Sequence, residues 1–180
     1  PDGTVTRAEF LKMAMDSFGI GGHAYRDGEC LDATNDDWYC YYLQGALDKD
    51  IIPKEMIENC NVTKVTKTLA EATDDKKAVT TDVNVYTGKF DGDKPITREE
   101  MAAIAVRCKN YKMRRLTDWD NERRYPIFSF KDSDEIDEKY ISDVVEAYNL
   151  NYIDGMEDGR FAPKENLTRA QAAVVMNNLK

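Results

Sequence analysis

Apolar and polar residues follow one pattern at three places in the chain, and each copy begins with the same short phrase. The copies of the phrase are Thr6-Arg7-Ala8-Glu9, Thr97-Arg98-Glu99-Glu100 and Thr168-Arg169-Ala170-Gln171. Behind each Thr, apolar residues recur at offsets +4, +7, +8 and +11, except that the first copy has Ser17 at +11 with Phe18 beside it. This spacing places the apolar side chains on one face of an amphipathic helix. The pattern therefore predicts three helices, each of which begins at the phrase.

The phrase has the chemistry of a helix start. A Thr that is followed three residues later by Glu or Gln is typical of a capping box, in which the two side chains satisfy backbone amides that lack a partner within the helix. The predicted caps are Thr6 with Glu9, Thr97 with Glu100, and Thr168 with Gln171. The Arg that follows each Thr lies beside the positive end of the helix dipole. Arg7, Arg98 and Arg169 are therefore three related positions where an anion could be held.

A further predicted helix precedes two of the three capped helices. Residues 38–47 and 140–148 each begin with a large aromatic residue, Trp38 or Tyr140, and an Ile follows 13 positions later in both. The repeating unit is therefore a helix, a turn and a capped helix. In the middle unit residues 54–86 are an insertion, where Val62, Val65 and Leu69 predict a short helix and residues 78–86 alternate weakly as a strand does.

The residues around the phrase resemble those of the S-layer homology module, a repeat of bacterial cell-surface proteins. The family pattern has an aromatic first helix, an Asp-Gly-x-Phe-x-Pro connection and an Ile-Thr-Arg-Ala-Glu start to the second helix. The matching residues here are Asp158-Gly159-Arg160-Phe161-Ala162-Pro163 before Leu167-Thr168-Arg169-Ala170-Gln171, Ile96-Thr97-Arg98-Glu99-Glu100, and Pro1-Asp2-Gly3-Thr4 before Val5-Thr6-Arg7-Ala8-Glu9, where part of the loop is deleted.

The resemblance implies a fold and a set of repeats. We expect a mainly α fold of tandem helix-loop-helix repeats, packed as a pseudo-trimer around a shared helical core, with a small insertion of mixed structure. Residues 1–22 would be the second half of a first repeat, and residues 28–109 a second repeat that carries the insertion at about 54–86. Residues 110–127 would be a linker, and residues 128–180 a third repeat.

The resemblance also implies a function. Grooves between repeats of this family bind secondary cell-wall polysaccharide, commonly a pyruvylated amino sugar, and the Arg of the phrase contacts the ligand. A guanidinium matches the carboxylate of a pyruvyl ketal with two parallel hydrogen bonds. We therefore expect a module that anchors a larger surface protein noncovalently at the bacterial cell wall or S-layer, outside the cell. Its predicted glycan-binding residues are Arg7, Arg98, Arg169, Trp38, Tyr140, Gly155 and Gly159.

Each of these residues also has a purely structural interpretation. The arginines could make surface ion pairs with the many acidic residues, and Trp38 and Tyr140 could be core anchors. The chain also departs from the family pattern. Gln171 stands where the family has Glu, Tyr140 where it has Trp, and Cys30-Leu31-Asp32 only weakly matches the usual Phe-x-Asp opening.

The composition of the chain excludes some classes of binding partner. The net charge of −9 and the pI near 4.7 argue against binding to nucleic acid or to an anionic membrane surface, and no apolar run is long enough to cross a bilayer. There is no initiating Met and no signal-like start, so we interpret the chain as part of something longer. The spacing of zinc ligands is not found among the four cysteines, Cys30, Cys40, Cys60 and Cys108. The sequence is compatible both with disulfide bonds and with buried free thiols.

An enzyme is the weakest interpretation. His23 is the single histidine, and although it could pair with Cys40, no third group or oxyanion arrangement accompanies them. Asp91-Gly92-Asp93 lacks the ligand positions of the twelve-residue calcium loop of an EF-hand. We therefore predict no metal site, and we also predict no cofactor and no catalysis. A third interpretation is a structural or protein-interaction module that has lost glycan binding and uses the insertion as a new surface.

Overall fold

The computed structural model describes residues 2–22, 30–34, 36–70, 77–114 and 130–179. Its α-helices and β-strands are α1 (Arg7–Ser17), α2 (Cys40–Leu47), β1 (Glu58–Ala70), β2 (Val79–Lys89), α3 (Arg98–Arg114), α4 (Ile141–Asn149) and α5 (Arg169–Asn178). Short 3-10 turns follow Pro53 and precede α4.

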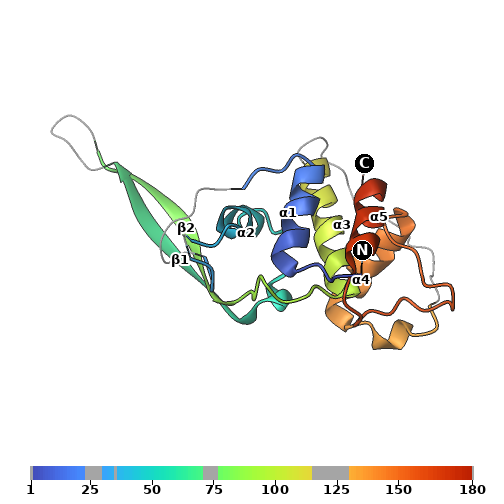
Figure 1. Ribbon diagram of the computed structural model, residues 1–180. Coiled ribbons are helices and arrows are strands. Elements are labelled where there is room, and N and C mark those ends of the chain that lie inside the picture. The colour runs from blue at the N-terminus through green and yellow to red at the C-terminus, as the bar shows by residue number, and fades with distance from the viewer. Residues whose placement is uncertain (1, 23–29, 35, 71–76, 115–129, 180) are drawn as a thin grey trace.

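Three helices, α1, α3 and α5, begin at the repeated phrase and confirm the three helices predicted from the sequence. They lie side by side in the middle of the molecule (Figure 1), and α3 is the most deeply buried, since residues 101–106 are fully covered. The segments in front of the helices are joined in pairs by single β-bridges, Thr4 to Thr168, Thr6 to Pro95 and Thr97 to Asn166. The three helix starts are therefore held together at one end of the core.

The two aromatic helices are also present, as α2 and α4, but their alignment is one residue different from the one that the sequence suggested. Tyr39 and Tyr140 are the N-cap residues of α2 and α4, and both are buried. The amide of Ile51 donates to the carbonyl of Ala46, as the amide of Tyr152 does to that of Ala147. Tyr39, rather than Trp38, is thus the structural counterpart of Tyr140, and Trp38 is left 53% exposed.

The insertion is a long antiparallel hairpin. Strand β1 pairs with β2 in the register Val62 to Tyr86 and Thr68 to Thr80, and the ribbon extends away from the helices (Figure 1). The strand expected at residues 78–86 is confirmed, but the short helix expected around Val62 and Leu69 is wrong. Residues 62–68 hold five Val and Thr residues, whose branched side chains pack better on a pleated strand than on a helix.

This ribbon changes the fold class. The described residues contain five α-helices and a two-stranded sheet, so the fold is mixed α and β. The expectation of a mainly α pseudo-trimer is therefore wrong. Helix α3 also continues to Arg114, past residue 110 where the linker was expected to begin. Most of that linker and His23 lie outside the described residues. Among the helices that the structure describes, none is long and apolar enough to span a membrane.

Candidate functional site

Reciprocal hydrogen bonds close the start of each capped helix. In α1 the Thr6 hydroxyl accepts from the Glu9 amide (3.2 Å), and a Glu9 carboxylate oxygen accepts from the Thr6 amide (2.9 Å). The same pair of bonds joins Thr168 to Gln171 and, with longer distances of 3.2 and 3.4 Å, Thr97 to Glu100. Each Arg of the phrase is consequently fixed as the first residue of its helix.

Arg7 is held inside the protein. Its guanidinium forms a buried ion pair with Glu100, in which Nε donates to Oε2 at 3.2 Å, and Nη1 donates to the carbonyl of Phe90 at 2.6 Å. The exposed fraction of both charged side chains is 8%. Arg7 thus ties the start of α1 to the start of α3 and to the end of the ribbon.

Arg98 is also buried, but its partners are backbone carbonyls. Nε donates to Phe161 (2.7 Å) and Nη2 to Asp154 (3.1 Å), and the guanidinium lies over the Phe161 ring, 5.1 Å from its centroid. Burial lowers the pKa of Arg98, against the opposing charges of Glu165 and Asp132. Among the described residues, no carboxylate forms an ion pair with Arg98.

Two aspartates that the sequence analysis did not predict as site residues shape the loops around these arginines. Both carboxylate oxygens of Asp132 accept backbone amides, from Phe161 and Ala162, each at 2.8 Å. Asp32 does the same for Phe90 and Asp91, at 2.8 and 2.9 Å. Each Asp therefore orients the carbonyl of a Phe that accepts a hydrogen bond from a buried Arg. The available signal was the Phe-x-Asp opening of the family, which Phe130-Lys131-Asp132 matches.

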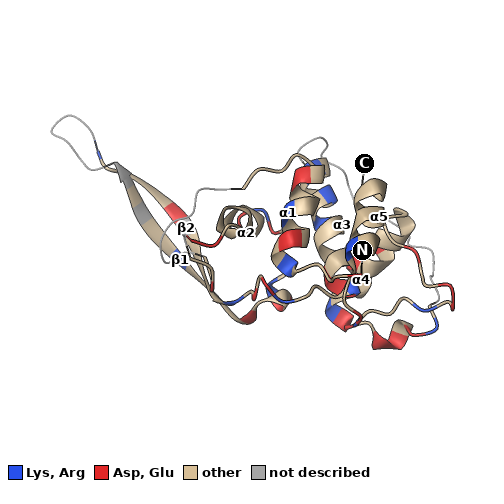
Figure 2. Ribbon diagram, in the orientation of Figure 1, with Lys and Arg blue, Asp and Glu red and all other residues tan. Residues whose placement is uncertain are grey.

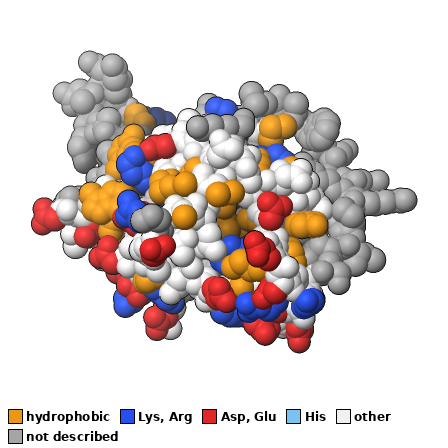
Figure 3. Space-filling model, turned by 45° about the vertical axis from the view of Figure 1, so that its right-hand side comes forward, with side chains coloured by type: hydrophobic (Ala, Val, Ile, Leu, Met, Phe, Trp, Pro, Cys, Tyr) orange, Lys and Arg blue, Asp and Glu red, His pale blue; other side chains and the backbone are white. Residues whose placement is uncertain are grey.

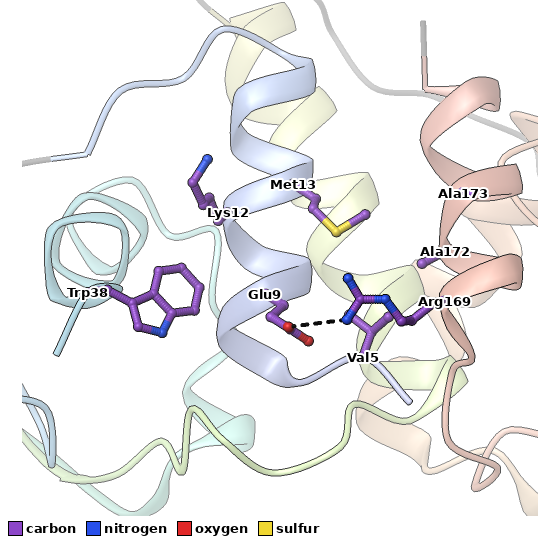
Figure 4. Close-up of a pocket in the computed structure, with 8 residues that line it drawn as sticks. All are labelled: Val5, Glu9, Lys12, Met13, Trp38, Arg169, Ala172 and Ala173. Atoms are coloured by element: carbon purple, nitrogen blue, oxygen red, sulfur yellow. Dashed lines mark ion pairs between the residues drawn. The ribbon is translucent and has the colours of Figure 1, made fainter. Parts of the chain in front are cut away.

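Arg169 is the exposed member of the set. Its side chain is 65% exposed, and its nearest acidic group is Glu9, with 3.7 Å between Nη1 and Oε1. It lines a half-open, mostly apolar cavity of about 240 Å³ between α1 and α5, in which Glu9 lies between Arg169 and the Trp38 ring (Figure 4). The lining residues are Val5, Glu9, Lys12, Met13, Trp38, Arg169, Ala172 and Ala173.

A second cavity, of about 180 Å³, lies where α3 and α5 meet the loop after α4. It brings together Arg98, Gln171 and Gly155, with Tyr152, Asp154 and Asn178 on its wall. A Cβ atom at Gly155 would come within 2.8 Å of the Phe130 ring, so this position requires glycine. The structure thus groups Arg98 with Gly155, and Arg169 with Trp38.

The remaining predicted residues lie elsewhere. Tyr140 is almost fully buried, and burial raises the pKa of its hydroxyl. Its ring is a core anchor rather than an open face. Gly159, with φ of +85°, forms an exposed turn beside Lys131 and lines neither cavity.

One part of the chain, which contains α4 and the start of α5, matches a known protein family. Residues 129–173 match the S-layer homology domain family. The chain therefore contains an S-layer homology domain. Such a domain is typically the cell-wall anchoring module of a surface protein, which places this chain at the bacterial cell surface.

The similarity to curated proteins extends well beyond the S-layer homology domain itself. The chain is 32% identical over 99% of its length to an amylopullulanase of Thermoanaerobacterium thermosulfurigenes and to exoglucanase XynX of Acetivibrio thermocellus. Over 54% of its length it is 37% identical to an endoglucanase of Bacillus sp. strain KSM-635. The chain spans only 8, 13 and 10% of these relatives, so it corresponds to a small part of each.

The surface around the S-layer homology domain carries charges of both signs. Acidic and basic residues alternate over the helices and loops (Figure 2), and the face drawn in Figure 3 mixes them with apolar side chains. With a net charge of −9, the chain has no basic field that would attract an anion from a distance.

The four cysteines are free thiols. Cys30, Cys40 and Cys108 are buried, and burial raises the pKa of Cys30 to about 12. A buried thiol that is protonated at neutral pH is a weak nucleophile. Cys40 cannot be compared with His23, because the histidine is outside the described residues.

Proposed function

We propose that this chain anchors a larger exported protein by binding an anionic secondary cell-wall polysaccharide that carries pyruvyl ketals. The observation that carries the proposal is the cavity between α1 and α5, where the exposed guanidinium of Arg169 and the exposed ring of Trp38 share one apolar recess. The names of the relatives support a glucan-degrading enzyme as the anchored protein.

The chemistry of this cavity fits such a ligand. A pyruvyl ketal fixes a carboxylate on a sugar ring, and Arg169 can donate two parallel hydrogen bonds to that carboxylate at the positive end of α5. Trp38 offers an aromatic face to the apolar side of the ring. The present partner of Arg169, Glu9, is 3.7 Å away and partly exposed, so the pair is weak and a ligand carboxylate can compete for it. Binding makes and breaks no covalent bond.

Repeated sites would strengthen the attachment. We propose that residues 28–109 and 128–180 are two repeats, that residues 1–22 are half of another, and that the linker at residues 110–127 begins within the last turn of α3. Two weak sites on one chain that face a polymer with repeated epitopes gain affinity through effective concentration. The exposed Arg169 cavity and the Arg98 cavity are the two candidate sites.

Co-sedimentation with purified cell-wall sacculi tests this function. The chain should pellet with sacculi that keep their secondary polymer and stay in solution after the polymer is removed by mild acid. Equal binding to stripped peptidoglycan would contradict recognition of the polysaccharide. Hydrolysis of a wall substrate by the purified chain would contradict a purely binding role.

A protein-interaction module is the second candidate, and the β1–β2 ribbon favours it. The ribbon projects from the helical body and exposes Val65 and Val79 (Figure 1). Replacing residues 64–84, the part of the ribbon beyond the buried Tyr86, by a tight turn separates the two candidates. A glycan anchor should keep its binding to sacculi, whereas a module that works through the ribbon should lose its partner.

A further inference from the structure

The arginine of each capped helix is associated with the third residue of another capped helix. Arg7 of α1 pairs with Glu100 of α3, and Arg169 of α5 faces Glu9 of α1. The remaining arginine, Arg98 of α3, shares its cavity with Gln171 of α5. Two of the three corners therefore hold a carboxylate beside the guanidinium, and the third holds a neutral amide.

This difference leaves the charge of Arg98 without a matching side chain. Its exposed fraction is 6%, and its described hydrogen bonds are to two carbonyl oxygens. The described acidic residues around it form no ion pair with it, because Asp132 is committed to two backbone amides, and Glu165 and Asp154 are exposed to solvent. A charge that is largely removed from water and lacks a counter-ion gains strongly from an anionic ligand.

Gln171 also contributes a hydrogen-bond donor that Glu could not. Its Oε1 atom accepts from the Thr168 amide at 3.0 Å and completes the helix cap. Its Nε2 group has no partner among the described residues, so it is available to donate within the cavity. A ligand carboxylate at Arg98 would thus meet a guanidinium and an amide instead of a guanidinium and an opposing carboxylate.

We propose that Gln171 makes the Arg98 cavity the preferred carboxylate site of this chain, ahead of the Arg169 cavity, where Glu9 competes with the ligand. The inference rests on the proposed function and assigns its ligand chemistry to one cavity. The occupant is one sugar residue that bears a fixed carboxylate. Asn178 on the cavity wall supplies polar groups for its hydroxyls.

A matched pair of near-isosteric substitutions tests the proposal. Gln171→Glu places a carboxylate beside Arg98, and Glu9→Gln removes the one beside Arg169. Both variants keep a side-chain oxygen that can complete the helix cap. The probe is a synthetic N-acetylhexosamine glycoside with a pyruvyl ketal, and the same glycoside without the ketal is the control ligand.

Amide spectra resolve the two cavities, because the Gly155 amide reports on the Arg98 cavity and the Trp38 indole N–H on the Arg169 cavity. In the unchanged chain, Gly155 should saturate at lower probe concentration than Trp38. Gln171→Glu should weaken binding at Gly155 by about tenfold or more, since a charge-assisted hydrogen bond is replaced by repulsion. Glu9→Gln should strengthen binding at Trp38 several-fold. Earlier saturation at Trp38, or an unchanged Gly155 response in Gln171→Glu, would overturn the proposal.

Unfolding experiments separate a lost site from a lost fold. Gln171→Glu gives Arg98 a counter-ion, so its thermal midpoint should be equal to or higher than that of the unchanged chain. The outcome for the proposed function is independent. A chain that binds sacculi with equal affinity before and after Gln171→Glu keeps the anchoring function and rejects the assignment of the cavity. A chain that binds neither sacculi nor probe rejects the function itself.

Discussion

The corners at Arg7 and at Arg169 have the same sequence logic and opposite environments. Each Arg is the first residue of a helix with a Thr cap, and each faces a Glu at the third position of another helix. At the buried corner the side chains of Arg7 and Glu100 are both 8% exposed, and the Arg7 guanidinium also donates a hydrogen bond to the Phe90 carbonyl. At Arg169 the Arg is 65% and the Glu 36% exposed. The repeated phrase therefore places each Arg at the start of a helix. The surrounding loops determine whether its guanidinium is buried as part of the fold or exposed to a ligand.

The largest expected effect is at the buried corner. Glu100→Ala leaves Arg7 as an unpaired buried charge and should lower the free energy of unfolding by about 3–5 kcal/mol. Glu9→Ala is the matched control, because it removes an equivalent cap residue but only a weak, exposed ion pair. It should cost about 1 kcal/mol. Urea denaturation measures both values, and equal losses would show that the two corners do not differ in the way that their exposure indicates.

Sequence reasoning predicted the local features of these corners because their causes are local. The Thr caps and the helical period depend on residues within four positions of one another. The burial of Arg7 depends instead on Phe90 and Glu100, which lie 83 and 93 positions away. No pattern in the phrase distinguishes it from Arg169.

The errors had similarly physical origins. A spacing of three and four suggested a helix at Val62 and Leu69, but branched side chains and pairing with β2 favoured a strand. Trp38 was aligned with Tyr140 because both are large and aromatic, whereas burial selects Tyr39. Asp132 was not predicted because its role, two bonds to amides 29 and 30 residues away, depends on a loop that closes over it.

At the exposed corner the expected effect is on binding. Arg169→Ala should weaken association with sacculi by about tenfold through loss of one of two linked sites. It should change the free energy of unfolding by less than about 0.5 kcal/mol, as is usual for an exposed side chain. Arg160→Ala removes another exposed, ion-paired guanidinium, outside both cavities. Equal weakening by the two variants would attribute the effect to net charge rather than to the Arg169 cavity.

A smaller effect is expected from the acid beside Glu100. Glu99 is 3% exposed and accepts from Lys164 and from the Asp137 amide, and burial raises its pKa above the usual 4.5. The folded state therefore binds this proton more tightly than the unfolded chain does. That stabilisation is complete below the unfolded pKa and is lost as the pH rises through the folded pKa.

Glu99→Gln should accordingly remove part of the fall in stability that begins near pH 4.5 and ends just above the folded pKa of Glu99. Urea midpoints measured at successive pH values give the slope. The exposed Glu138 supplies the control, and Glu138→Gln should leave the slope unchanged. A steeper slope in Glu99→Gln would mean that ion pairing with Lys164 outweighs burial at this position.

The smallest expected effect separates two neighbouring aromatic residues. Trp38 is 53% exposed beside the Arg169 cavity, and Tyr39 is buried as the N-cap residue of α2. Trp38→Ala loses little more than an edge contact with the Tyr39 ring, so it should cost about 1 kcal/mol or less of stability and weaken binding of the pyruvylated probe about threefold. Tyr39→Ala should instead destabilise the fold by about 3 kcal/mol, because it empties a core position. Thermal unfolding and probe titration, carried out on both variants, give the two values for each residue. If Trp38→Ala unfolds the chain as strongly as Tyr39→Ala does, Trp38 is a packing residue, and the Arg169 cavity has no aromatic face for a sugar.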